Sequence, residues 1–392
     1  EQVGLDLAEH LVRLGLDAPG TPVKVAEPYQ MLGEIQPDLL DALGVDVVGI
    51  GGPTNFYGFE NADWKEWTTF DGTPVLVPGL FCTDPDPATG DILMYPQGDR
   101  SVAPSARMPN GGFYFDAIIR QEPLDGKVLD PRENLEEFTL IDEAGLEHIR
   151  REAERWTATG KAVALVIGDT GFGDIAFVPG LKLKDPKGIR DVQEWYMSLA
   201  SRREYLHAVF DAQCEVGIQN LANIHRVAGE HISVVYVSGT DFGAQDRPFI
   251  APKSFRELFK PYHARVNEWI HANTAWKSFI HTDGAIFKLM PDLAEAGFDI
   301  LNPVQTSAAG MDPQLIKDTF GADFSFWGAG VETQTTLPFG TPQEVREEVK
   351  QRLDIFGKGG GYVFASIHNV QTRIPIENIV AFYEAFAENR EY

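Results

Sequence analysis

Two side chains two positions apart, His281 and Asp283, offer an imidazole nitrogen and a carboxylate at the end of one predicted strand. The apolar run Trp276–Ile280 predicts that strand, and residues two apart in a strand face the same side, so both groups can point to one place. His368 follows another predicted strand, which a barrel would bring back across the same mouth. Glu332, after a further strand, is a fourth candidate ligand. An imidazole and carboxylate set of this kind predicts a metal site.

Other polar side chains also gather at the ends of predicted strands. They are Asp46, Asp169, Asp174, Asp241, Asn302, Gln305, Gln334 and Asn369. Such a collection is expected when one rim of a parallel barrel carries the chemistry. The segment 168–174 (GDTGFGD) has the spacing of neither an EF-hand nor a phosphate-binding loop. We expect it to shape the backbone and to turn Phe172 and Phe177 toward an apolar ligand.

The elements that must position these groups alternate from Lys161 onward. Apolar runs predict strands at 162–167, 232–237, 276–280, 298–301, 324–327 and 362–366. Helical spacing predicts helices at 189–199, 203–227, 254–271, 286–296, 313–320, 341–356 and 376–388. Continuous apolar strands are typical of a parallel sheet that is buried on both faces. The predicted fold is therefore a (β/α)8 TIM barrel. A doubly wound open sheet is the alternative, but no Gly-x-Gly-x-x-Gly turn follows the first strand.

The first 160 residues have a less regular pattern. Amphipathic spacing predicts a helix over Glu1–Leu14, a second helix over Pro37–Leu43 and a strand over Val45–Ile50. Residues 51–160 mix short extended pieces with clusters of turn residues. We expect them to be N-terminal excursions, either insertions or a lid, within a single barrel that spans residues 1–392.

Composition excludes several classes of protein. The 58 acidic and 33 basic side chains give a formal charge of -25, which repels nucleic acid and anionic membrane surfaces. No segment approaches the roughly 18 consecutive apolar residues of a membrane-spanning helix, and no signal-peptide pattern begins the sequence. Cys82 and Cys214, the two cysteines, form neither a disulfide framework nor a Cys-x-x-Cys motif. A cytoplasmic protein is expected.

Four segments, 250–262, 281–313, 326–349 and 359–379, resemble the uroporphyrinogen decarboxylase superfamily. Within it they are most similar to the corrinoid-dependent methyltransferase branch. The resemblance covers the C-terminal half and implies a (β/α)8 barrel whose site lies at the carboxyl ends of the strands. True uroporphyrinogen decarboxylases carry an N-terminal Arg-Gln-Ala-Gly-Arg-Tyr segment whose arginines bind the carboxylates of the substrate. This sequence has no such segment, which disfavours a polyanionic tetrapyrrole substrate.

The methyltransferase branch often has His-x-Cys where this chain reads His281-Thr282-Asp283, with another cysteine near the position of His368. Replacing those thiolates with imidazole and carboxylate makes a harder zinc site, which suits polarisation of an oxygen better than activation of a thiol. The departure points to relatives that demethylate aryl methyl ethers. The cobalt(I) corrinoid (cobalamin) would arrive on a separate protein, because the chain has no second domain to hold it.

The resemblance also suggests roles for individual residues. We expect zinc to be held by His281, Asp283 and His368, with Glu332 as a further ligand, and Asp241, His281 and His368 to be the catalytic groups. The expected substrate contacts are Asp46, Phe172, Phe242, Asn302, Gln305 and Trp327. The family also suggests a homodimer.

Three alternatives stay open at this level. One is a metal-free decarboxylase of a uroporphyrinogen-like or small aromatic acid, with His368 or Asp46 as proton donor. Another is a methyltransferase that passes the methyl group from a corrinoid to a thiol. The third is a barrel that binds ligand without turnover, as the partner of a corrinoid protein.

Overall fold

The computed structural model describes residues 15, 18, 20–124 and 128–390. The helix predicted over Glu1–Leu14 lies outside this part of the chain. Within the described residues, no helix is both long and apolar enough to span a bilayer.

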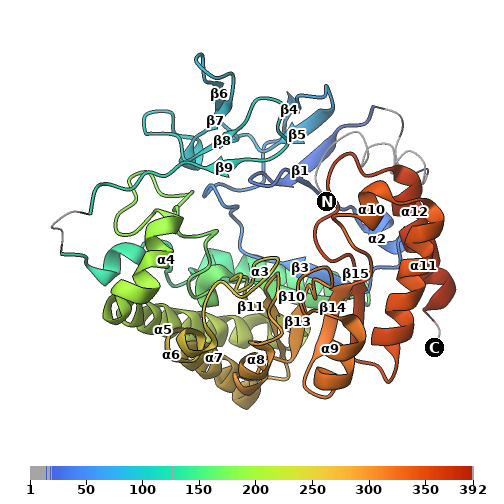
Figure 1. Cartoon of the computed structure of the whole chain (residues 1–392). Coiled ribbons are helices and arrows are strands. Elements are labelled where there is room, and N and C mark those ends of the chain that lie inside the picture. The colour runs from blue at the N-terminus through green and yellow to red at the C-terminus, as the bar shows by residue number, and fades with distance from the viewer. Residues whose placement is uncertain (1–14, 16–17, 19, 125–127, 391–392) are drawn as a thin grey trace.

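A curled parallel sheet of seven strands forms the centre of the fold (Figure 1). Neighbours in the sheet follow one another in the chain: β3 (Val47–Ile50), β10 (Ala162–Val166), β11 (Val234–Ser238), β12 (Lys277–His281), β13 (Ile300–Asn302), β14 (Ser325–Ala329) and β15 (Tyr362–Ala365). Sequential order with helical crossovers is the arrangement of a TIM barrel, as predicted. In the described residues the sheet has seven strands rather than eight, with β3 and β15 at its two edges.

The crossovers between these strands are helical. They contain α3 (Glu143–Thr157), α4 (Val192–Ser201), α5 (Arg203–Ala228), α6 (Pro252–Leu258), α7 (Lys260–Asn273), α8 (Met290–Glu295), α9 (Pro313–Phe320), α10 (Thr336–Phe339) and α11 (Pro342–Arg352), and α12 (Ile376–Asn389) follows β15. The single helix predicted over 254–271 is in fact α6 and α7, which separate at Phe259. Pro261 explains the break, because proline has no N–H to donate to the preceding turn.

Two smaller sheets precede the second strand of the barrel. One contains β1 (Val23–Glu27), β2 (Leu32–Gly33), β4 (Lys65–Thr68) and β5 (Pro74–Val77), and the other contains β6 (Thr83–Pro85), β7 (Ile92–Met94), β8 (Ala106–Met108) and β9 (Asp116–Ala117). Helix α2 (Pro37–Ala42) lies between β2 and β3 in the chain. Figure 1 shows strands β4 to β9 on one side of the parallel sheet, away from the helices α5 to α9. A lid function for residues 51–160 stays a prediction.

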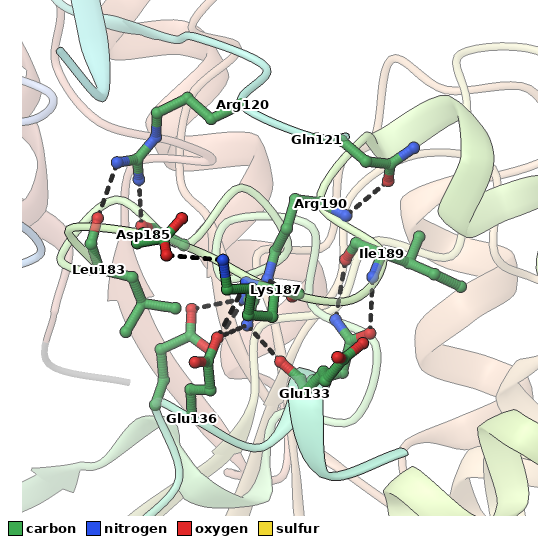
Figure 2. A network of polar contacts seen from close by, with 12 residues as sticks. Arg120, Gln121, Glu133, Glu136, Leu183, Asp185, Lys187, Ile189 and Arg190 are labelled. Carbon is green, nitrogen blue, oxygen red and sulfur yellow. Dashed lines mark hydrogen bonds and ion pairs between the residues drawn. The ribbon is translucent and has the colours of Figure 1, made fainter. Parts of the chain in front are cut away.

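A buried arginine ties this N-terminal region to the loop after β10 (Figure 2). Arg190 is 1% exposed, and its Nη1 donates to both carboxylate oxygens of Glu137 at 2.8 and 2.9 Å. Its Nη2 donates to Glu133 O and Glu136 Oε2, and its Nε donates to Lys187 O. Arg190 thereby joins residues 133–137 to residues 187–190.

One histidine is buried in the layer of helices without a polar partner. His263 on α7 is 0% exposed, its ring nitrogens have no hydrogen-bond partner, and Phe172, Phe242 and Phe298 contact the ring. Burial lowers the pKa of His263 to about 3.

We expect this histidine to make the fold less stable in mild acid. The unfolded chain takes up a proton near pH 6.5, whereas the folded chain takes it up only near pH 3, so protonation between those values favours unfolding. The free energy of unfolding should fall by up to about 1.4 kcal/mol per pH unit below pH 6.5. In His263→Phe this contribution should be absent. Urea unfolding at pH 7.5 and pH 5.0 measures this contribution. On going from pH 7.5 to pH 5.0, the wild type should lose about 2 kcal/mol more of its free energy of unfolding than the variant does. Parallel pH profiles would refute the expectation.

Candidate metal and substrate site

Three of the predicted ligands meet at the carboxyl end of β12. His281 Nε2 lies 3.2 Å from Asp283 Oδ2, and His368 Nε2 lies 3.9 Å from the same oxygen. One donor atom from each residue lies within 4.8 Å of the other two. His281 and Asp283 come from one strand end, and His368 comes from the loop after β15, three strands away in the sheet. The curl of the sheet therefore brings together groups 87 positions apart in the sequence.

Asn302 fixes the orientation of the His281 ring. Asn302 Nδ2 donates to Trp327 O at 2.9 Å, which leaves Oδ1 to accept from His281 Nδ1 at 2.5 Å. Since Nδ1 keeps its proton for this bond, Nε2 is the nitrogen that faces Asp283 and His368 and that can bind a metal once its own proton is displaced. A histidine that donates its second nitrogen to a fixed acceptor is the usual arrangement around a bound metal.

Removing this acceptor should weaken metal binding without removing a ligand. We expect Asn302→Ala to lower zinc affinity about 10- to 100-fold, the usual cost of losing a partner behind a ligating histidine. Asn302→Asp keeps an acceptor for His281 Nδ1 and should retain most of the affinity. Titration of each protein against a competing chelator provides the measurement. Equal affinity in Asn302→Ala and the wild type would show that Asn302 does not position His281.

The turn after β12 is held by backbone hydrogen bonds to two side chains. Asp283 N donates to Asp241 Oδ1 at 3.0 Å, and Gly284 N donates to Gln305 Oε1 at 2.9 Å. Gly284 has a φ of +86°, and a Cβ there would lie 2.4 Å from the carbonyl of Gly243. Glycine is therefore required at position 284 for the turn to pass this close to the neighbouring loop.

Several carboxylates surround His281. Burial lowers its pKa, but the hydrogen bond to Asp283 and the charges of Asp283 and Asp241 outweigh burial and raise it to about 9. Burial raises the pKa of Asp174 to about 6, with a further contribution from the Asp241 charge, and burial also raises the pKa of Asp241. Surroundings that favour an imidazolium also favour a divalent cation, which has to displace that proton when it binds.

The cluster opens into a hollow of about 460 Å³. The lining consists of Gln30, Ile35, Tyr236, His281, Asn302, Ala365, Ser366, Ile367, His368, Asn369, Val370 and Tyr383. Sequence reasoning missed Gln30, Tyr236 and Tyr383. Tyr236 lies in an apolar strand, and its ring stacks on Phe279 and His281 with centroids 5.2 and 6.4 Å apart. Gln30 comes from the turn after β1 and accepts from Asn369 Nδ2 at 2.7 Å.

Two of the three predicted substrate aromatics, Phe172 and Phe242, lie in the core instead. Phe172 is 0% exposed and packs against Phe210 and Tyr262, and Phe242 is 1% exposed and packs against Phe255 and Phe259. Both rings follow strand ends, but their loops turn back over the helices, where burial of a large apolar ring is favourable. The prediction that they contact substrate is therefore not supported, and Tyr236 and Tyr383 are the aromatic residues that line the hollow.

Asp46 and Glu332 are also not brought to the cluster. Asp46 is exposed and precedes β3, and its carbonyl accepts from Ala162 N at the amino end of the sheet, whereas His281 lies at the carboxyl end. The strand begins at Val47 and not at Val45, which removes Asp46 from the strand end where it was predicted. Glu332 lines a different hollow, and its Oε1 accepts from Gln334 N at 3.0 Å.

Gln305 and Trp327 support the site without lining the hollow. Gln305 holds the turn after Asp283 through Gly284 and donates to Gln245 Oε1 at 2.9 Å. Trp327 contributes its backbone carbonyl to Asn302, and its ring packs against Phe279 with centroids 5.3 Å apart. Their predicted substrate contacts are thus replaced by contacts to the residues that position His281 and Asp283.

Taken together, the sheet and the cluster define a TIM-barrel protein with a candidate metal site at the carboxyl ends of its strands. The family model for uroporphyrinogen decarboxylase (URO-D) matches residues 186–389, which is 204 of the 392 residues. The chain belongs to the URO-D family. Membership in this family indicates an enzyme and agrees with the barrel fold.

Comparison with other proteins adds little beyond the family. A methyltransferase from Methanosarcina mazei has a similar solved structure, with a TM-score of 0.49 and 14% sequence identity, and the match covers 98% of this chain and 97% of that one. Among curated proteins, none matches the sequence.

Proposed function

We propose that the chain is a zinc-dependent methyltransferase that moves a methyl group from a small methoxylated aromatic to the cobalt(I) corrinoid of a separate protein. The observation that carries the proposal is the group formed by His281, Asp283 and His368 at the mouth of a URO-D family barrel. Two further carboxylates, Asp174 and Asp241, add negative charge around it.

The donor set of the cluster fits zinc. Two imidazole nitrogens and one carboxylate oxygen within 4.8 Å of one another match the three protein ligands of a catalytic zinc site, which keeps a further position for substrate. Both cysteines are buried and neither lines the hollow, so the described site contains no thiolate. Zinc bound by such hard ligands would act as a Lewis acid on an oxygen atom.

The hollow fits a small substrate. Its volume of about 460 Å³ lies in the range of ordinary ligand pockets, and Ile35, Ile367, Val370 and Tyr236 offer apolar surface for one ring. Among the described residues, neither arginine nor lysine lines it. A tetrapyrrole with many carboxylates would need such cations, so a single aromatic ring is the better match.

The reaction requires that the ether O–CH3 bond break while both of its electrons stay on the oxygen. The corrinoid of the separate protein would accept the methyl group, because its cobalt(I) would supply the electron pair of the new bond. The phenolate that is left then takes a proton and departs as a phenol. In this scheme His281, Asp283 and His368 would hold the zinc, which would polarise the ether oxygen as a Lewis acid. Asn302 orients His281, and Asp241 orients Asp283 through its backbone N–H.

An anaerobic assay with chemically reduced cobalamin tests the proposal. The purified, zinc-loaded chain is mixed with cob(I)alamin and 2-methoxyphenol, and the cobalamin spectrum and the phenolic product are followed over time. We expect methylcobalamin and catechol to form in equal amounts, and neither to form without the protein. Further methoxylated benzenes extend the panel.

Parallel assays, one with aromatic acids and no cobalamin and one with methylcobalamin and a thiol, separate the alternatives. Release of CO2 from an aromatic acid without cobalamin would replace the proposal with the decarboxylase, in which His368 is the proton donor because Asp46 lies at the opposite end of the sheet. Transfer from methylcobalamin to a thiol, with no reaction of the ethers, would replace it with the thiol methyltransferase. Ligand binding without any of these reactions would replace it with the third alternative, a barrel that binds ligand without turnover.

A further inference from the structure

A second hollow lies beside the barrel mouth and shares no residue with the first. Its volume is about 780 Å³, and it lies between the loop after β13, the loop after β14, and helices α10 and α11. We call it the α11 groove. Its lining consists of Thr306, Ser307, Glu332, Thr335, Thr336, Phe339, Gly340, Glu344, Glu347, Glu348, Gln351 and Arg352.

The α11 groove carries an excess of negative charge. Four glutamates and one arginine line it, and Arg352 is already paired with Glu348 at 2.9 Å. Glu344 accepts from Thr341 at the start of α11, and Glu347 accepts from Gln343. These are local bonds to neutral groups, so the charges of Glu332, Glu344 and Glu347 have no basic partner among the residues that line the groove.

Besides its negative charge, the groove contains a buried carboxylate oxygen without a partner, on Glu332. This residue is 6% exposed, its Oε1 accepts from Gln334 N, and its Oε2 has no hydrogen-bond partner. Among the described residues, it is the one carboxylate with a buried oxygen left in this state. Thr306 Oγ1, a second acceptor of the groove, is also buried without a partner. Burying an ionised oxygen without a donor is costly, so this arrangement is that of a site prepared for a ligand with N–H or O–H groups.

The glutamates do not form a metal site. Among the described residues, the cluster around His281 is the one group of three or more ligands close enough to share an ion. Carboxylates spread along a groove suit a larger cation that has several N–H donors. Phe339 is 85% exposed and lines the groove. An aliphatic chain or an ammonium group of a ligand can therefore pack against its ring.

We propose that the α11 groove binds a primary aliphatic ammonium group, whose N–H donors reach Glu332 Oε2 and the Thr306 hydroxyl. The source is either a free aliphatic diamine or the lysine side chain of a partner protein, because both present the same group. The inference does not rest on the proposed methyl transfer, since the two hollows share no lining residue.

Calorimetry with the full chain tests the proposal. The probes are 1,5-diaminopentane for a free amine and Nα-acetyl-lysine methylamide for a protein side chain. Tetramethylammonium has the same charge per nitrogen but no N–H donor, and magnesium chloride tests for a metal site. We expect saturable binding of at least one amine probe with one site per chain, and no saturable binding of tetramethylammonium or magnesium. The tighter of the two amine probes identifies the source.

Substitutions place the binding in the groove. Glu332→Gln keeps the acceptor for Gln334 N but turns the buried ionised oxygen into a donor, and it should weaken binding about tenfold or more. Glu347→Gln, at the exposed edge of the groove, should weaken binding about two- to fivefold. This variant tests the location of the binding site if Glu332→Gln fails to fold. Glu268→Gln, an exposed change on α7 outside the groove, should bind as the wild type does. The proposal is overturned if neither amine binds, if tetramethylammonium or magnesium binds as tightly, or if the glutamate variants in the groove bind as Glu268→Gln does.

Discussion

Replacing His281 with alanine is expected to remove the bound zinc and to reduce methyl transfer about 10³-fold. A metal that stabilises developing charge contributes several kcal/mol, and each 1.36 kcal/mol corresponds to a factor of ten in rate. His281 is half-buried and contributes the nitrogen whose direction Asn302 fixes, so its loss leaves Asp283 and His368 as the remaining pair of the cluster. Elemental analysis of the wild type should give about one zinc per chain, and close to none in the variant.

The matched control for this change is His148→Ala. His148 is also half-buried, but it lies on α3 and lines neither hollow, so its loss should change neither the zinc content nor the rate. Circular dichroism should show the same secondary structure in both variants. Zinc retained in His281→Ala together with full activity would remove the cluster from the proposed mechanism, and zinc absent from the wild type would favour the metal-free decarboxylase.

The strand positions and the shared location of His281 and Asp283 could be predicted because both depend on local patterns. The seven strands of the sheet begin and end within about two residues of the predicted runs, since buried parallel strands are continuous apolar segments. His281 and Asp283 follow such a run directly. The placement of His368 needed one more step, the knowledge that carboxyl ends of parallel strands share one rim.

The rest of the hollow's lining could not be predicted, because it depends on how loops turn and on contacts between distant residues. Phe172 and Phe242 are aromatic residues in loops after strands, and nothing in their spacing tells whether such a loop turns toward the mouth or toward the helices. Gln30 reaches the site through a hydrogen bond to Asn369, 339 positions later in the sequence. Tyr236 sits between the buried residues Val235 and Val237, so its strand reads as uniformly apolar.

A second large effect is expected at the buried arginine of Figure 2. Arg190→Met should lower the free energy of unfolding by about 3–5 kcal/mol, the cost of removing one partner from a buried ion pair. Glu137 would stay behind in a buried position, where burial already raises its pKa in spite of the charge and hydrogen bonds of Arg190. The carbonyls of Glu133 and Lys187 would lose a donor as well.

Urea unfolding, followed by tryptophan fluorescence, measures this loss. The control is Arg132→Met, which removes an exposed arginine that pairs with Asp130 in the same segment, and it should leave the unfolding transition unchanged. The double variant Arg190→Met, Glu137→Met tests the reason for the effect. If the cost comes from the charge left buried, replacing both partners with apolar side chains of similar length should restore most of the stability.

The consequence for the site follows from what Arg190 joins. Residues 187–190 continue the loop after β10, which also contains Asp174, and Arg120 donates to the carbonyls of Gly180 and Leu183 in the same loop. Loss of Arg190 should therefore reduce methyl transfer at temperatures where the variant is still folded, because the loop that carries Asp174 is less firmly held. A variant that loses stability but keeps the wild-type rate would show that the arginine supports the fold alone. A variant as stable as the wild type would contradict the buried ion pair itself.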